Sequence, residues 1–273
     1  TKEGNMASEL KRIKKRKEAR GELEKLYEKS EQVFLIHYSC ESFYDIKDGR
    51  TPRVTSIALR NLKTAQTESF SIHKVAERRN VDISDIPEKY DTLEKEMLAD
   101  FFEYIKYRQN FSYIHWNMRD GNYGFSAIEH RFQVLGGEPL QVQDEKKFDL
   151  ARAIIDIFGR NYIDHGDCGR FISLVNYNNM TSKGMLTGKE EANAFDSAEY
   201  VKLHQSTLRK VDAMSNIVER VVDDSLLTCA TWKDKYGFHP KAIVEYVKEH
   251  WLWSLIAISA VLIGLVARVQ QWF

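Results

Sequence analysis

The sequence is poor in the features that identify several large classes of protein. It has only three cysteines in 273 residues, Cys40, Cys168 and Cys229, and they lie far apart. There is no CxxC pair and no Cys/His zinc spacing, and an odd, scattered set of cysteines is typical of a reducing compartment. Lys plus Arg and Asp plus Glu both number 40, so the net charge favours no particular partner.

The first segment, residues 1–31, is rich in charge and poor in apolar side chains. A thin apolar stripe at helical spacing runs through it, formed by Leu10, Ile13, Leu23 and Leu26. The segment is too basic and too weakly apolar to be a secretory signal. We expect a solvated basic helix. The alternative is an arm that contacts the phosphate groups of nucleic acid or of anionic lipid.

Three strands are predicted early in the chain. Residues 33–41 begin as a continuous apolar run, which is typical of a central strand covered on both faces. Residues 54–62 and 67–72 are two further strands, joined by a polar turn, and would fill one side of a sheet. Because side chains alternate along a strand, Ser39 and Glu41 at the end of the first strand share a face.

A polar cluster follows the next predicted strand. An amphipathic helix over residues 92–107 precedes it, and the short apolar run 111–114 is expected to be a buried strand. His115, Asn117 and Asp120 come next, before a helix over residues 125–134. These side chains therefore lie at the carboxyl end of a strand, where ligand crevices open in α/β sheets.

The second half of the chain reads mainly as helix, with predicted helices at 148–159, 190–208 and 209–222. The loop at 161–167 contains Asp164, His165 and Asp167. Such a group is compatible with a metal loop, but Asn, Asp and Gly are the usual residues of polar turns, and a turn is favoured.

The C-terminal region carries the longest apolar run. Residues 251–267 are 17 residues without a charge, which is near the lower limit for a membrane-spanning helix. Tryptophans flank the run, and Arg268 can extend to the interface. We expect a linker at 223–250, a transmembrane helix at 251–268 and a short tail at 269–273, with the main domain on the cytoplasmic side. The alternative is a buried core helix.

Taken together, these motifs resemble the DEDD-type 3′-5′ exonucleases of the ribonuclease H-like fold. The resemblance rests on a first strand that ends in Glu41, on the strand–His115–Asn117–Asp120–helix segment, and on Asp212-Ala213 in a late helix. It covers residues 32–222 and implies an α/β fold with a mixed sheet and flanking helices.

The resemblance also implies a set of roles. Two divalent ions, Mg²⁺ or Mn²⁺, would clamp the attacking and leaving oxygens of a phosphodiester. Glu41, Asp120 and Asp212 would hold the metal. His115 or His204 would be the general base, and Asn117 and Ser39 would contact substrate. Two positions depart from the family pattern: Ser39 replaces an aspartate, and Thr207 stands where a histidine is expected.

Two functions follow as expectations. The first is a membrane-anchored, metal-dependent nuclease or phosphodiesterase that acts on nucleic acid or a nucleotide. The second is a catalytically impaired module that binds such a ligand and signals through its membrane helix, contacting lipid there. Either plan would suit antiviral defence in bacteria, and a homo-oligomer is compatible with both. Ordinary structural roles also stay open, as surface carboxylates for Glu41 and Asp212, a turn residue for Asp120 and a core histidine for His115.

Overall fold

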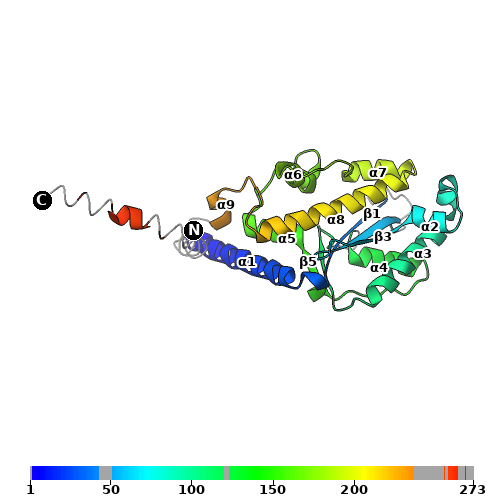
Figure 1. Ribbon diagram of the computed structural model, residues 1–273, viewed down its shortest axis with the longest axis horizontal. Helices are drawn as coiled ribbons and strands as arrows, with labels where there is room; N and C mark the ends of the chain where they lie inside the picture. The colour runs from blue at the N-terminus through cyan, green and yellow to red at the C-terminus, as the bar shows by residue number, and fades with distance from the viewer. Residues whose placement is uncertain are drawn as a thin grey trace.

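A five-stranded mixed sheet lies at the centre of the computed structural model (Figure 1). The structure describes residues 2–42, 51–119 and 123–236, together with 255, 258–263 and 268, and side chains from residue 11 onward. The strand order is β3-β2-β1-β4-β5. The strands are β1 (Val33–Cys40), β2 (Val54–Asn61), β3 (Thr67–Ser71), β4 (Ser112–His115) and β5 (Lys147–Asp149).

The pairing of the strands is compatible with a ribonuclease H-like fold. β1, β2 and β3 form an antiparallel meander, whereas β4 and β5 run parallel to β1. All eight residues of β1 are buried, as its continuous apolar start predicts for a central strand. The register places Ser39 opposite Ser56 and Leu35 opposite Arg60 on β2.

Helices cover both faces of the sheet. Helices α3 (Ile86–Lys106) and α4 (Phe125–Val134) pack on the face that carries Phe34, Ile36 and Tyr38 of β1. On the opposite face, α5 (Leu150–Phe158) and α8 (Tyr200–Val222) pack against Val33 and Leu35. Ser39 also faces this second side of the sheet, because it has the same parity in β1 as Leu35.

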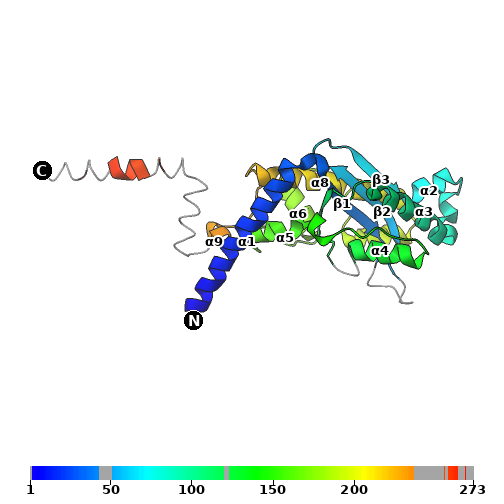
Figure 2. The same cartoon turned by 90° about the horizontal axis from the view of Figure 1, so that it is seen from below.

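The remaining helices are peripheral. They are α1 (Lys2–Glu28), α2 (Ile72–Arg78), α6 (Gly169–Tyr177), α7 (Gly188–Asp196) and α9 (Trp232–Tyr236), with 3₁₀ turns at Ser30–Gln32, Ile83–Asp85 and Asp144–Lys146. The predicted N-terminal arm is part of the body at its second half, since Leu23 is buried in the core and Arg16 donates to the carbonyl of Ile157 at 3.0 Å. Figure 2 shows α1 lying beside α5 and extending past it toward the N-terminus.

The structure confirms β1, β2, β3, β4 and α4 close to their predicted bounds. It differs from the sequence prediction in several elements. Helix α3 begins earlier, with Pro87 in its first turn, where its missing N–H costs no hydrogen bond. Helices α2 and α6 and strand β5 were not predicted. The two predicted late helices divide differently, because α7 ends at Asp196 and α8 begins at Tyr200.

Within the described parts of the chain, no helix is both long and apolar enough to cross a membrane. The predicted span at 251–268 falls mostly outside those parts, so it stays a prediction.

Candidate functional site

A row of buried hydroxyl groups joins the carboxyl-terminal half of β1 to helix α8. The Ser39 Oγ lies 2.7 Å from the Thr207 Oγ1, which in turn lies 2.8 Å from the Ser56 Oγ of β2. Ser39, Ser56 and Thr207 have no measurable exposure. Thr207 is therefore the α8 residue that faces Ser39.

An ion pair adjoins these hydroxyls. The Lys210 ammonium lies 2.7 Å from the Glu191 carboxylate of α7, and both side chains are nearly buried. The same Glu191 oxygen accepts hydrogen bonds from Ser39 at 3.1 Å and from Ser206 at 3.3 Å. An ion pair whose carboxylate contacts Ser39 thus lies where the family resemblance expects several carboxylates around a metal.

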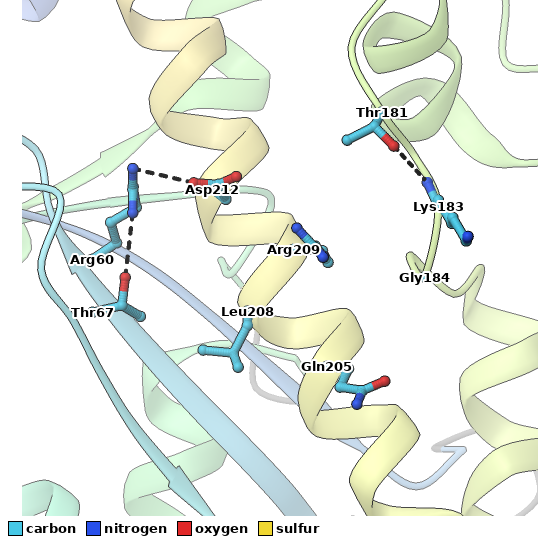
Figure 3. Close-up of a pocket in the computed structure, with 9 residues that line it drawn as sticks. All are labelled: Arg60, Thr67, Thr181, Lys183, Gly184, Gln205, Leu208, Arg209 and Asp212. Carbon is cyan, nitrogen blue, oxygen red and sulfur yellow. Dashed lines mark hydrogen bonds and ion pairs between the residues drawn. The ribbon is translucent and has the colours of Figure 1, made fainter.

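Asp212 lies elsewhere. It is five residues beyond Thr207, or about 140° around an α-helix, and its carboxylate pairs with Arg60 at 3.1 Å. Arg60 sits opposite Leu35, four residues before Ser39 in β1, which is roughly 13 Å along the strand. The structure therefore does not bring Asp212 together with Ser39. Figure 3 shows Asp212 and Arg60 in a separate pocket over α8.

A crevice opens beside the Lys210–Glu191 pair. Its volume is about 200 Å³. We define the crevice by six of its lining side chains, which come from β1, the β4–α4 loop, α6, the start of α7 and α8: His37, Trp116, Arg170, Thr187, Lys210 and Met214. Trp116 packs edge to face on Phe171, with 4.8 Å between the ring centroids. The crevice thus combines an aromatic wall with two cationic groups.

His37 is a buried polar group of the crevice with incomplete hydrogen bonding. It is only 8% exposed. Its Nδ1 lies 3.4 Å from the Tyr123 hydroxyl, while its Nε2 has no hydrogen-bond partner among the described residues. Burial, with a contribution from the Lys210 charge, holds the pKa of His37 well below its ordinary value. A buried polar atom without a partner costs free energy, and a ligand in the crevice is a natural partner for a neutral imidazole.

His115 has a structural role in the described geometry. Its Nδ1 accepts the N–H of Met118 at 3.1 Å, so the ring proton is on Nε2. Burial lowers the pKa of His115 to about 4, although the Asp149 charge acts in the opposite direction. The neutral ring therefore holds the turn after β4, and its acceptor nitrogen is already engaged.

Asn117 belongs to a polar cluster in the same turn. Its backbone has φ of 58°, in the left-handed region that asparagine tolerates. Its N–H donates to Asp149 at 3.2 Å, and its side-chain oxygen accepts from Arg119. Arg119 in turn pairs with Asp149 at 2.7 Å. The predicted substrate contact is thus used to fix the loop that carries Trp116.

His204, the second candidate base, lies one turn before Thr207 on α8. Its ring centroid is 5.1 Å from that of His73 on α2. Burial, with His73 and Lys74 nearby, lowers the pKa of His204 to about 4. His204 therefore belongs to a packing contact between α2 and α8 rather than to the lining of the crevice.

The last two predicted ligands are Glu41 and Asp120. Glu41 follows β1 directly and is 4% exposed, whereas Asp120 lies outside the described residues. Among the residues that the structure describes, no three His, Cys, Asp or Glu side chains gather to hold a metal. The donor set around Ser39 also fits a divalent pair poorly, because it consists of neutral hydroxyls and one carboxylate, Glu191, which is already paired with the Lys210 ammonium.

Sequence reasoning missed His37, Glu191, Arg170 and Lys210. His37 and Ser39 share a face of β1 by strand parity, so the alternation of side chains alone could have predicted that His37 lies beside Ser39. Glu191 and Lys210 carried no such signal, because their pairing depends on how α7 and α8 pack together. Comparison of the chain with protein-family models, with curated proteins and with solved structures finds no match.

Proposed function

We propose that this chain is an exonuclease-like module that binds the end of a nucleic acid strand, or a nucleotide, in the crevice without hydrolysing it. The observation that carries the proposal is the Lys210–Glu191 ion pair next to Ser39 and Thr207. The Lys210 ammonium neutralises the carboxylate that contacts Ser39, so this carboxylate is already paired without a metal ion.

The side chains of the crevice suit a nucleotide. A base can stack on an aromatic wall such as Trp116, an interaction that tolerates any base. Arg170 and Lys210 present cationic donors for a phosphate. His37 adds a neutral ring nitrogen without a described partner, which can hydrogen-bond a ribose or base edge. None of these contacts needs a metal.

The nuclease is the second candidate, and Glu41 favours it. This carboxylate is buried at the end of β1, at the position of the glutamate in the family's first motif. In that case Glu41 and Asp120 would hold Mg²⁺ or Mn²⁺, which would polarise the phosphodiester. Ser39 and Thr207 would then be tolerated variations. Cleavage separates the two candidates, whereas binding alone does not.

The location of the module is also a proposal. The apolar run at 251–268 would anchor the chain in a membrane as a single span, with residues 32–222 on the cytoplasmic side. Binding of a ligand in the crevice would then be reported at the membrane.

The test uses the full chain in neutral detergent micelles with EDTA present. Fluorescence anisotropy measures the binding of a labelled nucleotide and of a labelled oligothymidylate. We expect Trp116→Ala to weaken both by about 1–3 kcal/mol, the usual contribution of one stacked base. Arg160→Ala, at an exposed arginine that does not line the crevice, is the matched surface control. Equal affinities for Trp116→Ala and the wild type would refute binding in the crevice.

A further inference from the structure

A second pocket crosses the exposed side of α8. Its volume is about 670 Å³. We call it the groove and define it by residues from β2 and β3, from the α6–α7 segment and from α8: Arg60, Thr67, Thr181, Lys183, Arg209 and Asp212. Figure 3 shows α8 running between the two sides, with Arg60 and Thr67 on one side and Thr181 and Lys183 on the other.

The charge of the groove is positive. Among its described lining residues, Asp212 is the only acid, and Arg60 already neutralises it at 3.1 Å. Arg60 is itself held by the carbonyl of Ala65 at 2.7 Å. Lys183 and Arg209 therefore contribute two uncompensated positive charges. Single-signed charge in a concave surface attracts an oppositely charged ligand.

Lys183 and Arg209 are available to such a ligand. In the described part of the chain, no ion pair or side-chain hydrogen bond engages the Arg209 guanidinium or the Lys183 ammonium. Figure 3 shows Arg209 extending from α8 toward the side where Lys183 lies. Both residues line the groove, so an anion bound there is attracted by two positive charges. The hydroxyls of Thr67 and Thr181 add neutral donors.

The groove and the crevice are connected by one short segment. Thr181, Lys183 and Gly184 line the groove, and the residues just after them, Leu186, Thr187 and Gly188, line the crevice. The segment lies against α8, where the Leu186 N–H donates to Ser206 at 3.0 Å. A chain molecule with one end in the crevice can therefore continue along this segment to the groove.

We propose that the groove binds the phosphodiester backbone of a nucleic acid strand whose end occupies the crevice. This inference rests on the proposed function, because it extends the same ligand beyond the crevice. The groove contains no aromatic side chain among its described lining residues. It therefore holds phosphates rather than bases, and it binds without regard to sequence.

The experiment compares charge reversals in the full chain, in micelles with EDTA. Arg209→Glu and the double variant Lys183→Glu/Arg209→Glu are measured against Arg160→Glu, which makes the same charge change as Arg209→Glu but outside the groove. The probes are labelled oligothymidylate and a labelled mononucleotide. We expect each lost phosphate contact to weaken strand binding roughly tenfold at about 0.1 M salt and to lower the salt slope by about one. Mononucleotide binding stays unchanged.

Asp212→Asn gives a change of opposite sign. Removing the one acid of the groove frees Arg60 for a phosphate, so strand binding tightens and its salt slope steepens. Thermal unfolding of every variant checks that the fold is retained.

The outcomes are separable. If the groove substitutions change neither mononucleotide binding nor strand binding, the proposal for the groove is refuted and the proposal for the crevice is not. If the wild type does not bind the mononucleotide but its binding of the strand still depends on Lys183 and Arg209, the proposed crevice site is refuted and the groove is not. Soluble inositol trisphosphate is the third probe. If Arg209→Glu weakens its binding but does not weaken binding of the strand, the groove binds another phosphate compound and the nucleic-acid proposal is refuted.

Discussion

Ser39 and Thr207 are the two residues at which the sequence departs from the pattern of the family it resembles. Each replaces an ionisable group of the resembled family with a hydroxyl, and the two hydroxyls contact each other at 2.7 Å. A hydroxyl pair is neutral at every ordinary pH, so it neither recruits nor repels a divalent ion. The charge next to it comes from Lys210 and Glu191. These four side chains are the basis of the proposal that the crevice binds a ligand without metal chemistry.

His115 provides a prediction on pH. Its pKa in the folded chain is lowered to about 4 from 6.5, so the unfolded chain binds more protons between these values. The neutral ring therefore stabilises the fold above about pH 6.5, and this contribution, up to about 3 kcal/mol, is lost as the pH falls toward 4.

We expect His115→Asn to keep an acceptor for the Met118 N–H but to remove this titration. Denaturant unfolding between pH 6.5 and 4.5 should show a slope smaller than that of the wild type by up to about 1.4 kcal/mol per pH unit. The remaining slope contains the titration of His204, whose pKa is lowered in the same direction. An unchanged slope would contradict the assigned role of His115.

At the scale of elements, the sequence predicts strongly periodic segments and misses those set by packing. β1 is evident from its apolar start, and α4 from its glycine-bounded helical run. β5 escapes prediction because it is only three residues long, with one buried side chain, Phe148. The break between α7 and α8 is hidden too, because Ala198 adopts a left-handed conformation that no glycine announces.

The same limit applies to the site. The sequence correctly predicts that polar residues follow β1 and β4 on neighbouring strands. It cannot fix the rotation of α8 about its axis, which is why Asp212 resembled a site residue while Thr207 and Lys210 are the ones beside Ser39. A shift of five residues along a helix turns a side chain to a different face. Assignments on strands are therefore more dependable here than assignments on the long helix.

At the scale of the whole molecule, the strand order joins a sequence-predictable meander to two parallel strands, and this places the crevice and the groove on the α8 side of the sheet. The proposed membrane anchor would hold this body at a lipid surface. We expect the double substitution Ile258→Asp/Leu262→Asp to release the chain from the membrane fraction after a carbonate wash, since each acid near the centre of a span costs about 2.5–3.5 kcal/mol.

The control for this experiment places the same charges outside the predicted span, as Gln270→Asp/Gln271→Asp. The account predicts that this control stays in the membrane fraction. Equal retention of both double variants would show that residues 251–268 do not insert.

The central claim is binding without hydrolysis. The direct measurement incubates the full chain with labelled oligothymidylate and its RNA counterpart, in Mn²⁺ and in EDTA, and follows both the bound fraction and the length of the strand. The account predicts equal binding in the two conditions and strands that keep their full length. Shortening that requires Mn²⁺, and that Glu41→Gln and Asp120→Asn each abolish, would contradict it and establish the nuclease.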